Sequence, residues 1–370
     1  MCDARSKGGN CVLAGTSAGS KTSRFRRAHN LRFAGVRTLP AGLAPERLAA
    51  TLAAGWRLEI AAMQYVPEGA GSYHWKLTDA NGRPHFVTVD DLDSKDWFGH
   101  VRETVFEGLR RALDTAAALR HEVGLEFVVA PVAARDGEFL RRVDDRYTVS
   151  VFPFLTGRSY SFGGYADGRL RDEAMDMIAA LHQSTAVVQD RAPRHVPSYA
   201  GRDDLSAFLL DPDRPWEGGP YSEPAHRLLM TNAADLAELA AGFDRLVNST
   251  ATARAHPVIT HGEPHQANVM SVDGRLVLID WDTVAMAPPE RDVSLIATSR
   301  NEGIGRYEQT AGRALDPRVI TLYRLRWYLD DIASAIRLFG KRHGDTADTL
   351  RSWNALAPDL EQLPEWLALL

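Results

Sequence analysis

A short hairpin in the second half of the chain constrains the fold most. Two apolar, β-branched runs flank an Asp-Gly pair within residues 269–279. An Asp-Gly pair between such runs predicts two antiparallel strands joined by a type I′ turn. Counting back from this two-residue turn pairs Val269 with Leu278 and brings Asn268 and Asp280 together at the open end of the hairpin.

The open end of this hairpin gathers oxygen ligands. A hard cation such as Mg²⁺ takes carboxylate and amide oxygens, with phosphates and water completing its shell. Glu263 precedes Asn268 in a loop made irregular by Gly262 and Pro264, so its carboxylate can reach the same volume. An acid that handles a hydroxyl proton, beside an amide and a carboxylate that share a magnesium ion, is typical of a phosphoryl-transfer site.

Two plainer interpretations compete. His261, Glu263 and His265 superficially match a zinc-binding His-Glu-x-x-His helix, but that pattern needs both histidines on one helical face. Gly262 and Pro264 break such a helix. An ordinary hairpin with polar ends does not explain why Glu, His, Asn and Asp gather at one end. We therefore favour phosphoryl transfer.

Residues 258–296 resemble the aminoglycoside phosphotransferase family, relatives of choline kinases and, more distantly, of protein kinases. The Ala-Pro-Pro-Glu-Arg-Asp-Val run at 287–293 is most similar to the spectinomycin phosphotransferase branch. The order of elements agrees over roughly residues 45–340, but the resemblance is specific only in this core. It implies an α+β, protein kinase-like fold of two lobes: a small N-terminal lobe with an antiparallel sheet and a larger, mainly helical C-terminal lobe.

The resemblance also implies roles for single residues. Glu263 takes the position of the family's catalytic aspartate, and its longer side chain is a departure from the pattern. The implied catalytic residues are Glu263 and His265, the metal ligands Asn268 and Asp280, and the supporting residues His261, Asp282 and Asp292.

A second departure concerns the nucleotide site. The family places a lysine on the third strand to bind the nucleotide phosphates, and Thr88 stands there. A threonine supplies no positive charge, so Lys76 on the neighbouring strand is a candidate substitute. The favoured alternative is that Lys76 is a solvated edge lysine. The expected nucleotide-binding residues are Gly69, Gly71, Ser72, Lys76, Thr88, Val151, Phe152 and Phe154.

The acceptor pocket is expected on a helix over residues 319–339. It carries Tyr323, Trp327, Asp330 and Asp331, and aromatic rings beside carboxylates suit a polyhydroxylated cation. The alternative is that these aromatic residues belong to the core and the carboxylates face water.

The apolar patterns predict the remaining elements. Strands are expected over 56–65, 72–78, 85–90, 127–132 and 147–155, the last ending in an interlobe hinge at Pro153. Helices are expected from residue 44 over a short segment and over 101–122, 172–183, 227–247 and 319–339, with a proline-broken insert over 186–225. His182 is expected to form hydrogen bonds at the core edge rather than to act in catalysis.

Composition gives the chain-level expectations. The 370 residues suffice for two modest lobes, which we place at 41–152 and 153–370. Residues 1–40 carry eight Lys or Arg against one Asp and predict a disordered basic tail. Its basicity also permits attraction to nucleic acid or anionic lipid, and its arginines and scarce acids allow a transit peptide. Its Gly-x-Ser-x-Gly match at 15–19 lacks the flanking strand and helix of a nucleophile elbow.

Together these patterns predict a cytoplasmic O-phosphotransferase that uses Mg²⁺ and ATP, possibly GTP. Its acceptor is expected to be a hydroxyl of a small molecule such as an aminoglycoside, aminocyclitol, amino sugar or related metabolite. Two cysteines argue against a disulfide framework, and no apolar run is long enough for a membrane span. We expect a monomer or homodimer without nucleic-acid or membrane partners. The alternative is a kinase-like binding or scaffold protein, which the threonine at position 88 favours.

Overall fold

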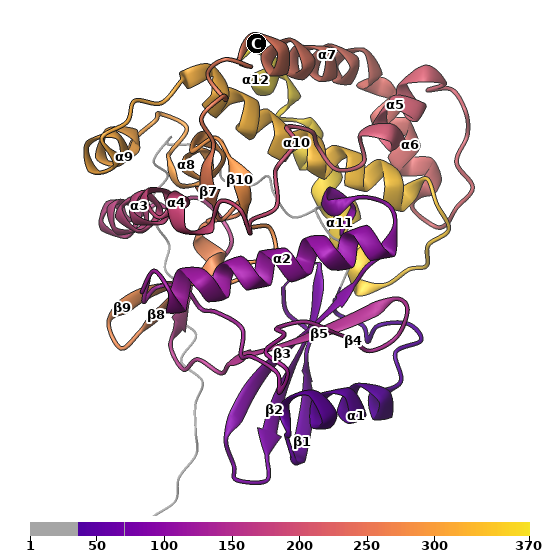
Figure 1. The fold of residues 1–370 in the computed structure, drawn as a ribbon. Coiled ribbons are helices and arrows are strands. Elements are labelled where there is room, and N and C mark those ends of the chain that lie inside the picture. Colours follow the sequence, from indigo (N-terminus) through magenta and orange to yellow (C-terminus); the bar gives the residue numbers. More distant parts are fainter. Residues whose placement is uncertain (1–35, 70) are drawn as a thin grey trace, which may run out of the picture.

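The computed structural model describes residues 36–69 and 71–370, which form a small lobe of strands and a larger lobe of helices (Figure 1). The predicted two-lobe, kinase-like architecture is confirmed. Most of the predicted basic tail, and the match at 15–19, lie outside the described residues. Across the described ranges, no helix combines the length and the apolar character needed to cross a bilayer.

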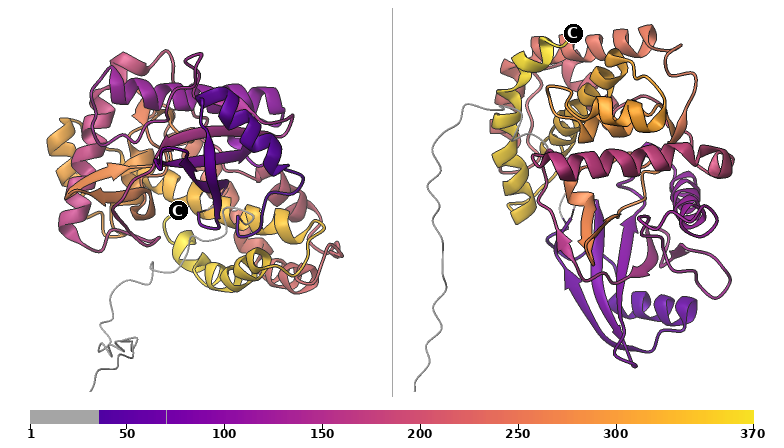
Figure 2. Two further views of the ribbon diagram at one scale, coloured as in Figure 1. Left: turned by 90° about the horizontal axis from the view of Figure 1, so that it is seen from below. Right: turned by 90° about the vertical axis from the view of Figure 1, so that its left-hand side faces the viewer.

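The small lobe is built on one antiparallel sheet with the strand order β1-β2-β3-β5-β4. The strands are β1 (Ile60–Val66), β2 (Ser72–Asp79), β3 (Pro84–Asp91), β4 (Arg141–Arg142) and β5 (Tyr147–Pro153). Helix α1 (Pro45–Trp56) covers one face, where Leu48 and Leu52 pack with Trp75, Val87 and Val149 (Figure 2). Alternation along β2 and β3 leaves their other side chains on the opposite face.

The register of β2 and β3 sets the chemistry of that opposite face. Ser72 pairs with Asp90, and His74 pairs with Thr88. Residues two apart on a strand point to the same side. All four side chains therefore share the face that the sheet turns toward the large lobe.

Helix α2 (Arg102–His121) runs between the sheet and the large lobe (Figure 1). The large lobe holds helices α3 (Gly168–Gln183), α4 (Thr185–Val188), α5 (Arg202–Leu210), α6 (Ser222–Thr231), α7 (Ala233–Ser249), α8 (Glu290–Ile296), α9 (Ile304–Ala311), α10 (Pro317–Phe339), α11 (Ala347–Leu360) and α12 (Leu363–Leu367). Its short strands are β6 (Arg158–Ser159), β7 (Val258–Thr260), β8 (Val269–Val272), β9 (Arg275–Leu278) and β10 (Ala285–Ala287), and the 3-10 turns are η2 (Asp96–Phe98) and η3 (Gln266–Asn268).

Local chemistry explains where several helices begin. Asp167 and Asp316 each accept a backbone N–H as N-caps of α3 and α10, and a reciprocal capping box between Thr346 and Thr349 starts α11. Such caps satisfy backbone donors that a helix leaves unpaired in its first turn. The predicted helices over 101–122, 172–183 and 319–339 are confirmed within a few residues.

The hairpin predicted within residues 269–279 forms as expected. β8 pairs with β9 from Val269 opposite Leu278 to Val272 opposite Arg275. Asp273 and Gly274 both have positive φ, 50° and 79°, as a type I′ turn requires.

Three predicted elements differ from the structure. The helix expected from residue 44 continues to Trp56, so the strand expected from residue 56 starts only at Ile60. The helix expected over 227–247 breaks at Asn232, whose side chain donates to the carbonyl of Leu228 and ends α6.

The third difference is the strand expected over 127–132. Its backbone exchanges hydrogen bonds with Leu278 of the large lobe, from Leu278 N to Phe127 O at 2.7 Å and from Val129 N to Leu278 O at 3.1 Å. β4 instead takes the edge beside β5. The segment thereby ties the small lobe to the β8–β9 hairpin.

Candidate active site

A cavity of about 640 Å³ lies between the two lobes. Its wall combines the exposed face of the sheet with the loop before β8 and the residues after β9. The predicted site residues that line it are Gly69, Ser72, Thr88, Phe152, Phe154, Glu263, His265, Asn268, Asp280, Asp282 and Trp327. Residues far apart in the sequence thus meet in one volume.

Asn268 and Asp280 form the oxygen-rich end of this cavity. Asn268 is 7% exposed and donates its amide N–H to the Glu263 carbonyl at 3.0 Å, which fixes the amide and leaves its oxygen as an acceptor. Asp280 has a φ of 68°, a strained value of the kind that recurs at functional sites. Burial, and then the charges of Asp282 and Glu263, hold the pKa of Asp280 well above its usual value.

A bound cation would relieve this repulsion. Within the described ranges, no group of three or more His, Cys, Asp or Glu side chains is arranged to hold an ion by itself. The pair suits an ion that completes its shell with phosphate and water oxygens, as Mg²⁺ does. The residues present therefore fit the predicted metal.

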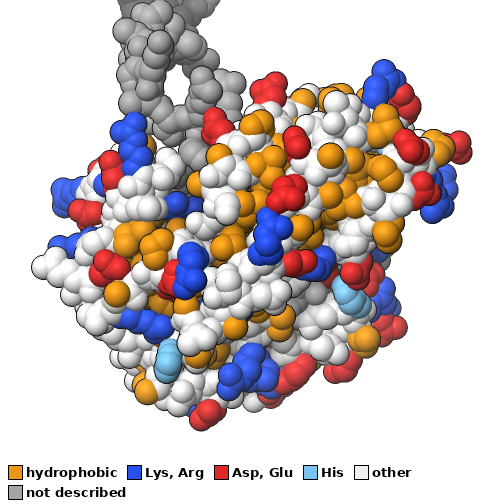
Figure 3. Space-filling model, turned by 90° about the horizontal axis from the view of Figure 1, so that it is seen from above, with side chains coloured by type: hydrophobic (Ala, Val, Ile, Leu, Met, Phe, Trp, Pro, Cys, Tyr) orange, Lys and Arg blue, Asp and Glu red, His pale blue; other side chains and the backbone are white. Residues whose placement is uncertain are grey.

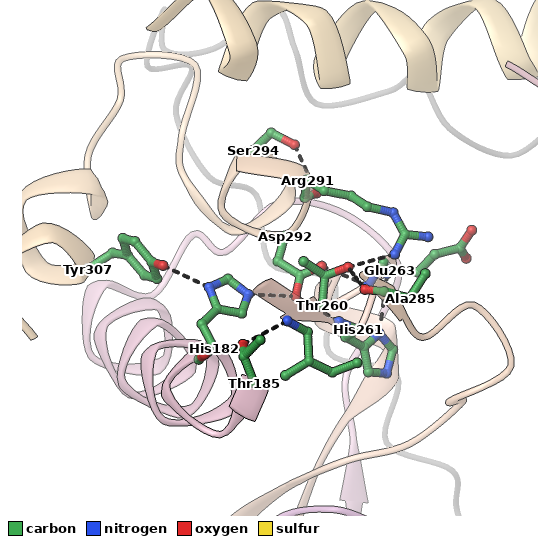
Figure 4. Close-up of polar contacts among 12 residues, drawn as sticks. His182, Thr185, Thr260, His261, Glu263, Ala285, Arg291, Asp292, Ser294 and Tyr307 are labelled. Carbon is green, nitrogen blue, oxygen red and sulfur yellow. Dashed lines mark hydrogen bonds and ion pairs between the residues drawn. The ribbon is translucent and has the colours of Figure 1, made fainter. Parts of the chain in front are cut away.

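Asp292, at the start of α8, braces the loop that carries Glu263 (Figure 4). Its carboxylate is fully buried and accepts the backbone N–H groups of His261 at 2.8 Å and Gly262 at 2.7 Å. His182 Nε2 lies 3.1 Å from the same carboxylate, and His182 Nδ1 lies 2.7 Å from the Tyr307 hydroxyl. The prediction that His182 forms structural hydrogen bonds is confirmed.

The electrostatics of Asp292 favour its charged form. Burial would raise its pKa, but the hydrogen bond from His182 and the charges of His182 and Arg291 outweigh burial and leave the pKa below its usual value. A carboxylate that accepts several N–H bonds is expected to stay ionised. Asp292 therefore fixes two successive peptide groups ahead of Glu263.

His261 is a neutral side chain that supports the loop carrying Glu263. Its Nε2 lies 2.9 Å from the Ile279 carbonyl, and its Nδ1 accepts the backbone N–H of Glu263 at 3.2 Å. Burial lowers its pKa to about 4, and the nearby charge of Asp292 only partly offsets that effect. Because one ring nitrogen donates and the other accepts, the neutral imidazole links the loop to the hairpin.

Arg291 is a site residue that the sequence argument did not single out. It is 5% exposed, donates to Thr260 Oγ1 at 2.8 Å and to the Thr283 carbonyl at 2.9 Å, and packs against Gly262. Burial, and then repulsion from Arg326, lower its pKa to about 10. Figure 4 shows the Glu263 side chain on the same side of the loop as the Arg291 guanidinium. The sequence signal that could have identified Arg291 was its place beside Asp292 in the Ala-Pro-Pro-Glu-Arg-Asp-Val run.

A second, smaller cavity of about 70 Å³ adjoins Glu263. Arg291, Arg326, His195 and Asp330 are among its lining residues. Glu263 borders both cavities. It therefore stands between the oxygen-rich end of the main cavity and a cluster of cations.

The nucleotide half of the main cavity carries no charge at the expected lysine position. Thr88 Oγ1 lies 3.4 Å from His74 Nδ1, and burial lowers the pKa of His74 to about 4. Lys76 Nζ lies over the ring of Phe154, 4.8 Å from its centroid. Val151 is buried in the core of the sheet, and Gly71 has a φ of 84° in the loop before β2.

The other half of the cavity is aromatic. The His265 ring lies 4.8 Å from Phe162 and 5.9 Å from Trp327, centroid to centroid. Of the other predicted acceptor residues, Tyr323 is buried against His195. Asp330 accepts the Ala200 N–H at 2.5 Å and borders the smaller cavity, and Asp331 is buried in α10 near Asp359.

Comparisons with known proteins show the family of this chain. Residues 62–328 match the model of the phosphotransferase enzyme family. Protein StrN of Streptomyces griseus is 27% identical over 315 residues, which cover 78% of this chain and 92% of that protein.

Solved structures show the same fold at low identity. A spectinomycin phosphotransferase in complex with ADP and spectinomycin has a TM-score of 0.66 at 15% identity, covering 89% of this chain and all of that one. An amicoumacin kinase in complex with AMP-PNP, Ca²⁺ and amicoumacin has a TM-score of 0.56 at 14% identity, covering 87% and 94%. Since the family model spans well over half of its length, this chain belongs to the phosphotransferase enzyme family of small-molecule kinases.

Proposed function

We propose that this protein transfers the γ-phosphoryl group of ATP or GTP, with Mg²⁺, to a hydroxyl of a small amine-bearing polyol. The observation that carries the proposal is the meeting of Glu263, Asn268 and Asp280 in one interlobe cavity. Asn268 and Asp280 would hold the metal, which when bound offsets the negative charge of the phosphates.

In this proposal Glu263 receives the proton of the acceptor hydroxyl. The acceptor oxygen forms a new bond to the γ-phosphorus as the bond from that phosphorus to the bridging oxygen breaks, and a nucleoside diphosphate leaves. Asp292 and His261 keep the Glu263 backbone in place through the hydrogen bonds that fix the loop. Positioning of this kind, together with electrostatic stabilisation, supplies almost all of the catalysis in phosphoryl transfer.

The acceptor class follows from the lining of the cavity. Phe162, His265 and Trp327 supply aromatic surface, while Glu263 and Asp348 supply carboxylates. Rings and carboxylates together suit a cationic, hydroxylated molecule. The spectinomycin bound in a related phosphotransferase structure supports an aminocyclitol as the acceptor.

The second candidate is a kinase-like binding protein without transfer activity, and the neutral pair formed by Thr88 and His74 favours it. One experiment separates the two. We expect ATP or GTP with Mg²⁺ to raise the melting temperature, and nucleotide to be consumed with at least one member of a panel of amino sugars, aminocyclitols and amino alcohols. Binding without consumption would support the binding protein, and neither effect would contradict both.

A further inference from the structure

Lys95 is a buried cation in the loop between β3 and η2. Its side chain is fully buried. Its Nζ lies 2.9 Å from Asp90 Oδ1 and 2.6 Å from Asp282 Oδ2, and donates to Ser72 Oγ at 3.0 Å. A lysine ammonium has three N–H donors. These three oxygens match all of them.

The contacts of Lys95 join the two lobes. Ser72 and Asp90 are register partners on β2 and β3, and Ser72 Oγ donates to Asp90 Oδ1 at 2.6 Å. Asp282 belongs to the large lobe and follows the predicted metal ligand by two residues. The Trp97 ring lies 5.1 Å from Nζ and adds a cation–π contact. Lys95 is therefore a bridge between the sheet and the metal-binding end.

Four carboxylates gather at this end of the cavity. Asp90, Asp280, Asp282 and Glu263 all line the same cavity. Lys95 contacts two of these four carboxylates directly.

The position of Lys95 also bears on the lysine that is missing at position 88. Thr88 and Asp90 are two residues apart on β3, so both face the cavity. Thr88 supplies a hydroxyl, whereas Asp90 binds the Lys95 ammonium. The ammonium of Lys95, from the following loop, is balanced by the carboxylates of Asp90 and Asp282, so it fixes these side chains rather than presenting a positive charge to the cavity.

We propose that Lys95 is a positioning residue that ties the sheet of the small lobe to the metal-binding end of the large lobe. Because it is fully buried behind Asp90 and Asp282, it acts through these carboxylates and not by touching the nucleotide. It holds the two lobes in a fixed relative position. It also fixes the segment that contains Asp280 and Asp282, where the metal and the nucleotide phosphates would bind. This inference rests on the proposed function.

The test compares Lys95→Met with Arg102→Met. Arg102 is the first residue of α2, and its guanidinium binds Asp93, on the connection that also holds Lys95, through two 2.7 Å contacts away from the cavity. Affinity for ATP is measured by calorimetry with excess Mg²⁺ and again with EDTA. We expect Lys95→Met to weaken binding of the Mg²⁺ complex roughly 10- to 100-fold, as loss of residues that orient metal ligands does. Metal-free binding should change much less, and Arg102→Met should leave both affinities close to those of the unaltered protein.

If Lys95→Met does not fold, Asp282→Asn carries the same test, because it breaks the interlobe contact and leaves Lys95 paired with Asp90. If both fold, the double variant should lose less affinity than the two single losses combined, because the residues act as a unit. A folded Lys95→Met protein with unchanged Mg²⁺-dependent affinity would overturn the inference, as would equal losses with and without Mg²⁺. An unaltered protein that binds no nucleotide would overturn the proposed function as well.

Discussion

At the scale of single residues, the site depends on the close packing of Gly262 against Arg291. Gly262 has a φ of 100°, and a Cβ at this position would lie 2.3 Å from Arg291 Nη2. Arg291 has little freedom to move because it donates to both Thr260 and Thr283. The residue before Glu263 is therefore constrained by its own backbone and by its neighbour.

We predict that Gly262→Ala destabilises the protein more than Gly274→Ala does. Gly274 has a φ of 79° but no atom within 4 Å of an added Cβ. Gly274→Ala should cost about 1–2 kcal/mol for the left-handed backbone, and Gly262→Ala a further ~1–3 kcal/mol for overpacking. Urea denaturation of both variants measures the difference. Equal losses would show that Arg291 does not confine the loop.

At the scale of elements, α10 and α11 bury two carboxylates near each other. Asp331 on α10 and Asp359 on α11 are each 1% exposed. Burial, and then the charge of Asp331, raise the pKa of Asp359 to about 8. The folded state therefore retains a proton on Asp359 at pH values where the unfolded chain has lost it. The contribution of Asp359 to stability falls as pH rises from about 4 to about 8.

We predict that Asp359→Asn removes this loss. The variant should gain stability over the unaltered protein as pH rises through that window, by up to about 1.4 kcal/mol per pH unit. Above about pH 8 the gain should level off. Asp213→Asn, on an exposed loop, serves as the control and should show no such trend. Parallel pH profiles for Asp359→Asn and the unaltered protein would contradict the account.

Some of these elements could be predicted from the sequence, and others could not. The β8–β9 hairpin was predictable because its turn residues and alternation are local. The segment 127–132 was misassigned because its hydrogen-bond partner, Leu278, lies far along the chain. Lys95 was missed for a similar reason: its carboxylate Asp282 is 187 residues away, and an isolated lysine in a loop has no local signature.

At the scale of the whole molecule, the candidate chemistry lies where the two lobes meet. The small lobe contributes the sheet face, and the large lobe contributes Glu263, Asn268 and Asp280. The surface of the large lobe in Figure 3 intersperses Lys and Arg with Asp and Glu. On that face no single sign of charge dominates. Four carboxylates, by contrast, line the interlobe cavity: Asp90, Glu263, Asp280 and Asp282.

The central claim is that Glu263 serves transfer rather than nucleotide binding. The most direct measurement is ³¹P NMR of the phosphomonoester formed from the best acceptor, with nucleotide affinity measured in parallel. We predict that Glu263→Gln lowers the transfer rate by at least about 100-fold, while nucleotide affinity stays within about threefold because ground-state binding is separate from catalysis. Glu263→Asp, which keeps the carboxylate but shortens its reach, should also lose roughly 100-fold. Unchanged turnover in Glu263→Gln would contradict the account.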